Sequence, residues 1–234
     1  MILMRSPKGG VGTTFLTARL AIALAGRGLE VSAIDCTRQD SLKLFFEISP
    51  TQELEVLGSA LTSDAVSGVQ LFRADTDAEP RTLADLLQAH CGDRRVCIVD
   101  LGAAPMAWRR ALLPQAAIEI CPLVPSPVAL AALTQVDDAE PVLSLTRTAF
   151  ILNQLDDRRR LSNDIHKLVR TLFGDQLLGT VRRDEAVNEA LAAMKPLAAF
   201  APASAALSDI EQTASTLIAR LGLSEAPDRQ EAVA

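Results

Sequence analysis

Aromatic residues are scarce in this chain of 234 residues, which has seven Phe, one Trp and no Tyr. Because 49% of the residues are nevertheless hydrophobic, we expect a core built mainly from Ala, Leu, Val and Ile. No apolar run approaches the roughly 20 residues that a membrane-spanning helix needs. The length and composition therefore predict one large domain around a single core.

Basic residues are also outnumbered, because the chain has 23 of them against 29 acidic residues, which gives a net charge of −6. Nucleic acids and anionic membranes are themselves negatively charged, so an acidic chain is a poor candidate for binding either. We therefore expect no nucleic-acid partner and no direct membrane insertion. No signal peptide is recognisable at the start of the sequence, which predicts a cytoplasmic protein.

Cysteine and histidine show no metal-binding pattern. The two histidines, His90 and His166, are predicted to be polar helix residues because nothing nearby completes a metal set. The four cysteines lack metal-type spacing, and most lie in or beside apolar runs. We expect them to be reduced, buried and inert; they are Cys36, Cys91, Cys97 and Cys121.

One glycine-rich stretch organises the chain, Lys8-Gly9-Gly10-Val11-Gly12-Thr13-Thr14. The apolar run Met1 to Met4 precedes it and predicts a strand, and the run Phe15 to Arg27 predicts a helix. A glycine-rich loop between a strand and a helix is the context of a phosphate-binding loop, because glycine lets backbone N–H groups approach an anion at the helix N-terminus. A glycine-rich turn without a ligand is the alternative.

The loop departs from the usual pattern G-x-x-x-x-G-K-[ST]. The final hydroxyl is present as Thr14, but Thr13 stands where the lysine is expected, and a different lysine, Lys8, opens the glycine run. This arrangement resembles the deviant Walker A motif of the MinD/ParA family of P-loop ATPases. The resemblance implies ATP and Mg²⁺ as cofactors, Thr14 as a Mg²⁺ ligand, and a homodimer in which Lys8 reaches the partner's nucleotide. It also implies a nucleotide cradle made of Gly9, Gly10, Val11, Gly12, Thr13 and Thr14.

Two later strands end in aspartate. The run Glu30 to Asp35 predicts a buried strand, and the family carries D-x-D here, with the second aspartate positioning the attacking water. This chain has Thr37 at that second position, so Asp35 is the candidate catalytic residue of this strand, with a cap of the next helix as the alternative. The run Val96 to Asp100 resembles a Walker B strand, which implies that Asp100 holds Mg²⁺ through water and that the Gly102 N–H meets the γ-phosphate.

Further strands and helices alternate along the chain, as expected for a doubly wound, mostly parallel sheet flanked by helices. Residues 41–68 have helical character, interrupted at Pro50. The strand ending at Asn153 resembles the family's base-reading strand, although a simple turn residue is as good an interpretation. Arg182 replaces a proline in a segment that resembles the one closing over the base.

The segment from Arg182 to Pro196, together with the loop, resembles the cellulose biosynthesis protein BcsQ (YhjQ) branch of the family. The resemblance implies an accessory of the cellulose synthase–secretion machinery, recruited to the inner membrane through its partners. It implies a nucleotide-dependent sandwich dimer with slow hydrolysis, and whether the protein is an enzyme is open. A partition or positioning ATPase and an inert scaffold are the alternatives. Residues 1–222 are predicted to form the nucleotide-binding domain and residues 223–234 a disordered tail.

Overall fold

The protein is built on one eight-stranded sheet with the strand order β10-β9-β6-β1-β5-β2-β4-β3. The structure, a computed structural model, describes residues 1–59, 64–92, 95–134, 136–137, 140–141 and 147–224. All neighbouring strands of this sheet pair in parallel except β3, which pairs antiparallel with β4. This confirms the predicted doubly wound, mostly parallel architecture.

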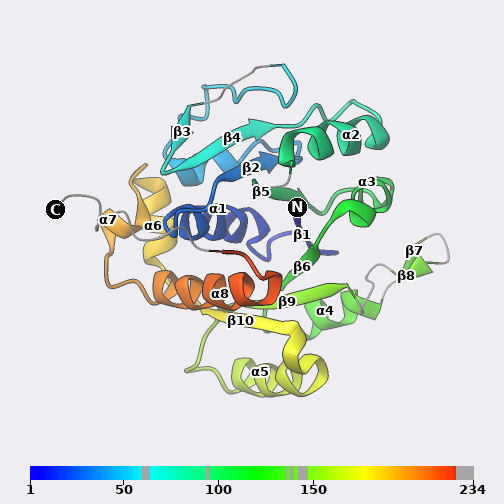
Figure 1. Cartoon of the computed structure of the whole chain (residues 1–234). Helices are drawn as coiled ribbons and strands as arrows, with labels where there is room; N and C mark the ends of the chain where they lie inside the picture. Colours follow the sequence, from blue (N-terminus) through cyan, green and yellow to red (C-terminus); the bar gives the residue numbers. More distant parts are fainter. Residues whose placement is uncertain (60–63, 93–94, 135, 138–139, 142–146, 225–234) are drawn as a thin grey trace.

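The strands of the main sheet alternate with helices along most of the chain (Figure 1). The main-sheet strands are β1 Ile2–Arg5, β2 Val31–Asp35, β3 Ala65–Val66, β4 Val69–Arg73, β5 Val96–Gly102, β6 Ile118–Leu123, β9 Thr148–Leu155 and β10 Leu177–Arg182. A separate pair is β7 Val136–Asp137 and β8 Glu140–Pro141. The α-helices are α1 Thr13–Ala25, α2 Pro80–Cys91, α3 Met106–Leu112, α4 Pro127–Ala131, α5 Arg160–Phe173, α6 Ala186–Ala192, α7 Leu197–Phe200 and α8 Ala205–Leu221. The 3₁₀ helices are η1 Leu42–Phe46, η2 Leu113–Gln115, η3 Ala132–Thr134 and η4 Gly174–Gln176.

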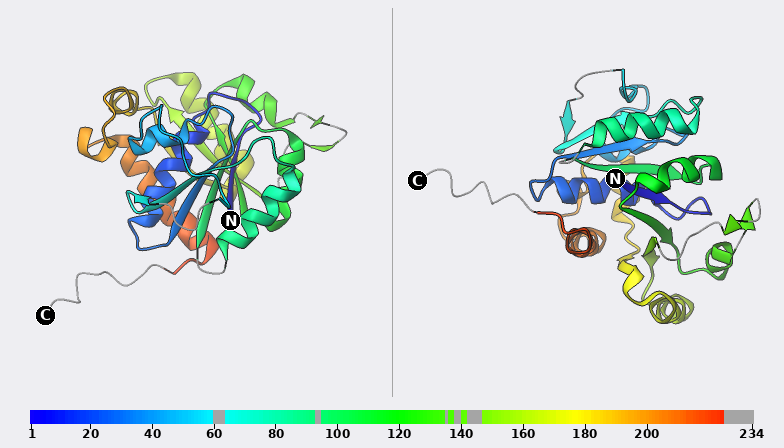
Figure 2. Two further views of the ribbon diagram at one scale, coloured as in Figure 1. Left: turned by 90° about the horizontal axis from the view of Figure 1, so that it is seen from above. Right: turned by 45° about the vertical axis from the view of Figure 1, so that its right-hand side comes forward.

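Helices cover both faces of the sheet (Figures 1 and 2). Side chains of α1, α6, α7 and α8 share one core cluster with β1, β2 and β5, and side chains of α2 and α3 form a second cluster on the opposite face. A third, smaller cluster lies under α4 and around β6 and β9. The central strands β1, β2 and β6 are buried at every position, as parallel strands covered on both faces must be.

The expected helical character of residues 41–68 is wrong for most of the described part of this segment. Only η1 is helical there, and its last turn ends at Glu47, which has a positive φ of 58°. The chain then runs beside the end of β4, where Leu57 N donates to Arg73 O and Arg73 N donates to Glu55 O. Leu54 and Leu57 are buried, so the leucines at mixed spacing pack an irregular segment and do not form one helix face.

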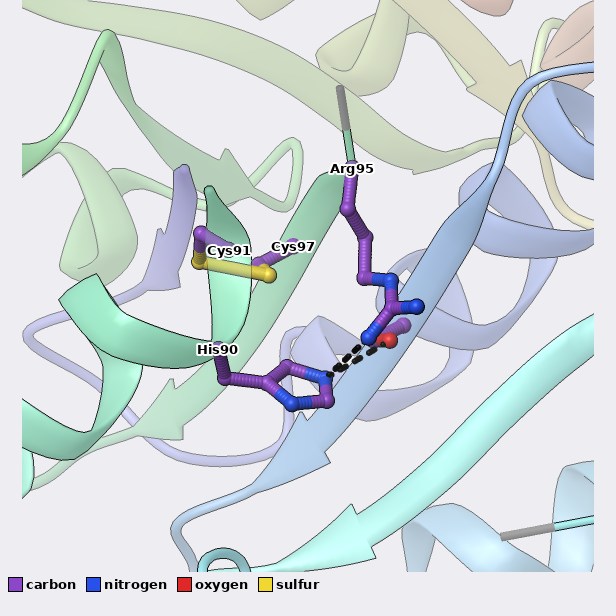
Figure 3. Close-up of a disulfide and its surroundings, with 5 residues drawn as sticks. His90, Cys91, Arg95 and Cys97 are labelled. Carbon is purple, nitrogen blue, oxygen red and sulfur yellow. Dashed lines mark hydrogen bonds between the residues drawn. A yellow bond between two sulfur atoms is a disulfide. The ribbon is translucent and has the colours of Figure 1, made fainter. Parts of the chain in front are cut away.

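The cysteine prediction is correct for two residues and wrong for two. Cys36 and Cys121 are free and buried, whereas Cys91 and Cys97 form a disulfide. Figure 3 shows the bond joining the end of α2 to the start of β5. The Cα atoms of the pair are 5.7 Å apart, a separation that a disulfide can span. The fold itself brings the two residues together, since a helix end and the next strand start lie side by side.

Two further expectations concern membranes and the tail. No helix in the described part of the chain is long and apolar enough to cross a membrane. The predicted tail falls mostly on residues 225–234, which lie outside the described residues. Before it, α8 ends at Leu221, and Gly222 in the left-handed conformation (φ 61°) caps the helix.

Candidate functional site

The glycine-rich loop lies at the carboxyl edge of the sheet, between β1 and α1. It is tied to the neighbouring strand because Ser6 N donates to Gly102 O at 3.0 Å. Gly9 and Gly10 are exposed, and nothing lies within 4 Å of the position that a Cβ would take on either. Val11 is buried beneath them. The loop therefore presents bare backbone to solvent directly before a helix N-terminus, where N–H groups and the helix dipole favour an anion.

Gly12 requires its lack of a side chain. Its φ is 85°, and a Cβ on it would come within 2.3 Å of the Asn153 side-chain nitrogen. Asn153, which is 3% exposed, donates from Nδ2 to Val11 O at 2.8 Å. Asn153 thus holds the loop from near the end of β9, a contact that no local sequence pattern predicts. Its predicted role in base recognition stays a prediction.

Asp35 is buried at the end of β2, and its carboxylate accepts three hydrogen bonds from the segment that follows. Oδ1 accepts from Thr37 N at 2.7 Å and from Thr37 Oγ1 at 2.6 Å, and Oδ2 accepts from Leu42 N at 2.9 Å. Burial raises the pKa of Asp35, while these hydrogen bonds lower it. This carboxylate therefore positions the backbone between β2 and η1, as the capping interpretation of the sequence expects.

Asp100 lies beside Asp35, because the two residues are register partners on β5 and β2. It is fully buried, and its Oδ1 accepts from Gly102 N at 2.9 Å. Oδ2 makes no hydrogen bond to any described residue. Burial raises the pKa of Asp100 to about 7, a rise that the Thr14 hydroxyl partly offsets. A buried carboxylate oxygen without a donor is costly, so the site is suited to a cation or to its bound water.

The Asp100 oxygen without a donor makes these residues suitable for a magnesium ion. Thr14 lies in the first turn of α1 and Asp100 on β5, and the Thr14 hydroxyl lowers the pKa of the Asp100 carboxyl. Oxygen ligands of this kind, one of them acting through water, are typical of Mg²⁺ sites that also use phosphate oxygens. Gly102 has a φ of 53°, and its N–H points at Asp100.

The two residues that distinguish this loop differ in exposure. Lys8 is exposed, and its ammonium group has no ion-pair partner among the residues that the structure describes. Thr13 opens α1 and is 8% exposed. The side chain at the usual lysine position is therefore short and buried, whereas the positively charged side chain of the loop, Lys8, is exposed.

Arg182 has a partner that sequence reasoning missed. Its Nε and Nη2 donate to Asp209 Oδ2 and Oδ1 at 2.9 Å and 2.8 Å, and its backbone N donates to Oδ2 as well. This bidentate pair fixes the end of β10 to α8. The predicted contact of Arg182 with nucleotide stays a prediction.

Gln154 is another residue at this edge of the sheet that no sequence motif marks. It adopts a positive φ of 57° directly after Asn153, and its Nε2 lies 3.8 Å from the Cβ position of Gly12. The only sequence signal for it was its place at the end of a strand of the carboxyl edge. In open α/β folds this edge is where ligands bind.

Comparison with known proteins assigns this geometry to a family. Residues 2–197 match the family model described as the CobQ/CobB/MinD/ParA nucleotide binding domain. A protein of Methanocaldococcus jannaschii, described as an uncharacterized ATP-binding protein, is 27% identical over 93% of this chain and 87% of its own length.

Solved structures share the fold. The ParA family ATPase from Chlorobium tepidum is 22% identical, with a TM-score of 0.73 over 92% of this chain and 97% of its own. The septum site-determining protein MinD from Pyrococcus horikoshii, complexed with Mg-ADP, is 18% identical, with a TM-score of 0.74 over 96% and 98% of the two chains.

Proposed function

The chain belongs to the CobQ/CobB/MinD/ParA nucleotide-binding domain family, and on that premise we propose that it is an ATP-binding accessory protein of bacterial cellulose synthesis and secretion. It acts as a nucleotide-dependent sandwich dimer with slow hydrolysis. One observation carries the proposal: Thr13 fills the usual lysine position while Lys8 stands exposed at the start of the loop. The cellulose assignment rests on the resemblance of this loop and of the segment from Arg182 to Pro196 to the BcsQ branch.

The missing lysine makes nucleotide binding dependent on a second copy. A charge-assisted bond to a phosphate contributes about 1.5–3 kcal/mol, so its loss weakens binding by about one to two orders of magnitude. Lys8 of a partner copy restores part of this contribution, but only in the dimer. Binding and dimerisation are therefore linked, and each favours the other.

The residues at the site divide the work of holding ATP and Mg²⁺. The backbone from Gly9 to Thr14 cradles the phosphates, while Thr14 and Asp100 hold the cation, the latter through water. A cation held by these residues would neutralise part of the phosphate charge. Thr37 offers a hydroxyl, which is no base at neutral pH, and that hydroxyl already donates to Asp35. Hydrolysis is slow for this reason, and the dimer persists as a signal.

Sizing of Lys8→Ala with ATP and Mg²⁺ tests the dimer. Wild-type protein should elute as a dimer with ATP and as a monomer without it, and Lys8→Ala should elute as a monomer in both cases. Arg38→Ala, which removes another exposed cation outside the glycine run, serves as the control and should behave as wild type. An ATP-driven dimer that forms unchanged in Lys8→Ala would refute the cross-dimer role.

Thr13→Lys tests the linkage from the other direction. This variant restores the usual loop, so its monomer should bind ATP about tenfold more tightly or better. Isothermal titration measures this directly, at a protein concentration too low for the dimer to form. Equal affinities of Thr13→Lys and wild type would mean that the missing lysine does not limit binding.

A partition or positioning ATPase is the second candidate, favoured by the family itself. It differs in its partner, because a DNA-bound partition protein needs a broad basic surface, whereas this chain has a net charge of −6. Co-purification from cells that make cellulose separates the two: cellulose synthase subunits support the first candidate and DNA supports the second.

A further inference from the structure

Helix α3 is joined to the sheet by a buried ion pair. The Arg109 guanidinium donates from Nε to Glu119 Oε1 at 2.7 Å and from Nη2 to Glu119 Oε2 at 3.0 Å. Thr148 donates from Oγ1 to the same Oε2 at 2.7 Å. Glu119 lies on β6 and Thr148 opens β9, and all three residues are buried. Both carboxylate oxygens of Glu119 therefore accept charge-assisted hydrogen bonds inside the protein.

The start of α3 is held at the carboxyl edge of the sheet. Arg5, the last residue of β1, donates from Nη2 to Sδ of Met106, the first residue of α3, at 3.3 Å. Residues 103–105 alone connect α3 to Gly102, the last residue of β5. Because so short a connection has little reach, the position of α3 restricts the position of Gly102.

Gly102 in turn orients the carboxyl group of Asp100. Its N–H donates to Asp100 Oδ1 at 2.9 Å, and the other oxygen, Oδ2, is the one without a donor among the described residues. A shift of Gly102 would therefore turn the oxygen that the cation site needs. The contacts thus run from the buried ion pair through α3 and Gly102 to Asp100.

A need for stability alone does not account for this ion pair. Two charges lose their water on burial, and apolar side chains of similar volume in place of such a pair often leave a protein equally stable or more so. Elsewhere α3 is packed in that apolar way, since Trp108 and Leu112 lie in a hydrophobic cluster with α2 and β5. The Arg109 fork adds direction, because two parallel hydrogen bonds to one carboxylate fix the rotation of α3 on the sheet.

We propose that Arg109 and Glu119 are positioning residues for the cation end of the nucleotide site. By fixing α3 they hold Gly102, and through it the Asp100 carboxylate, in the orientation that Mg²⁺ and its bound water require. The proposal rests on the proposed binding of ATP and Mg²⁺, and it names what sets the geometry of that site. Both residues act through the backbone of α3 and not by contact with nucleotide.

Replacing the whole polar set by apolar side chains separates positioning from stability. The variant Arg109→Met/Glu119→Leu/Thr148→Val leaves no charge or hydroxyl of the set buried without a partner, so its urea midpoint should stay close to that of wild type. The gain in ATP affinity that Mg²⁺ gives (the Mg²⁺ gain) should be about fivefold smaller than in wild type. Isothermal titration with and without Mg²⁺ measures this gain, at a protein concentration too low for the dimer to form.

Two further variants show whether the effect belongs to this ion pair. Arg109→Lys keeps the charge but loses the fork, so it should lose part of the Mg²⁺ gain. Arg27→Met/Glu211→Leu is the matched control. It removes an Arg–Glu pair that joins α1 to α8 at 2.8 Å, on the opposite face of the sheet, and it should keep the full Mg²⁺ gain.

Hydrogen exchange tests the positioning step without any nucleotide. Amides of residues 101–108 should exchange about fivefold faster or more in the triple variant than in wild type, because the hydrogen bonds of Gly102 N and Ala104 N would open more often. Amides of β2 should exchange at the wild-type rate.

Three results would each overturn the proposal: a full Mg²⁺ gain in the triple variant or in Arg109→Lys, unchanged exchange of residues 101–108, or an equal loss of the gain in Arg27→Met/Glu211→Leu. Failure of the proposed function gives a different result. A wild-type protein that binds ATP but never dimerises would refute that function and leave the Mg²⁺ gains readable, whereas a wild-type protein that binds no ATP would refute both.

Discussion

The carboxyl ends of β2 and β5 lie side by side and carry the same residue, yet their surroundings differ. Asp35 accepts three hydrogen bonds from the chain that follows β2. Asp100 accepts one from Gly102 and leaves Oδ2 without a donor among the described residues. Both side chains are buried and both pKa values are raised. Burial alone therefore does not indicate the role of a strand-end aspartate. The role is indicated by whether its carboxylate oxygens already have hydrogen-bond donors.

Asp100→Asn should give the largest effect, through the pH dependence of stability. The folded protein holds the Asp100 proton up to about pH 7, while the unfolded chain releases it near pH 3.8. Without Mg²⁺, the free energy of unfolding should therefore fall by about 4 kcal/mol as the pH rises through this range. The fall should be much smaller in Asp100→Asn, where the raised pKa of Asp35 still contributes, and it should be retained in full in the exposed control Asp157→Asn. Urea unfolding at several pH values measures this, and an equal fall in all three proteins would exclude Asp100 as its source.

Asp35→Ala should have the next largest effect, and of opposite sign at neutral pH. It removes the acceptor of Leu42 N and of both Thr37 donors, leaving buried N–H groups unpaired, which costs about 3 kcal/mol. Asp35→Asn keeps an acceptor for Thr37 and should cost about half as much. Urea unfolding at pH 7.5 should thus place Asp35→Ala below wild type and Asp100→Asn at or above it. A reversed order would contradict the comparison.

Magnesium should distinguish the two strand ends as well. Asp100→Asn should reduce the gain in ATP affinity that Mg²⁺ gives by about tenfold, because it removes the negative charge beside Thr14. Asp35→Asn should retain that gain, because the carboxylate oxygens of Asp35 already accept hydrogen bonds from Thr37 and Leu42. Isothermal titrations with and without Mg²⁺ measure both variants. Equal gains in the two variants would remove Asp100 from the cation site.

Thr37→Asp should give the smallest effect, a rise in ATP turnover of about threefold. The new carboxylate would replace a hydroxyl that donates to Asp35 Oδ1, so two like charges would be adjacent and only part of the gain would be realised. Phosphate release measures the rate, and Thr37→Asn is the control of similar size. Unchanged turnover would mean that the missing carboxylate does not limit hydrolysis.

The sheet could be predicted from sequence because its parallel strands are short apolar runs with turn signals between them. The run from Val96 to Asp100, for example, has no other stable place than a covered central strand. The segment at residues 41–68 could not be predicted, because it is an irregular chain that runs beside the end of β4. Its buried leucines have no regular spacing that would indicate this structure.

The site was predictable where one short motif carries it and unpredictable where distant segments meet. The loop from Lys8 to Thr14 and the aspartate ending β5 are readable from neighbouring residues. The Asn153 bond to Val11 O joins positions 142 residues apart, and the Arg182–Asp209 pair links β10 to a helix whose register was unknown. Only the folded chain places such groups together.

Because of the Cys91–Cys97 bond, the covalent state of the protein depends on whether it was prepared with a reductant. The bonded form carries two thiols, Cys36 and Cys121, and both are buried, so alkylation of the native protein should proceed slowly. Because the disulfide replaces two S–H groups, the intact mass should be lower by two hydrogens than after reduction. The bond ties α2 to β5, the strand that also carries Asp100. Samples handled with and without reductant are therefore two covalent species, and comparisons of variants are sound only within one of them.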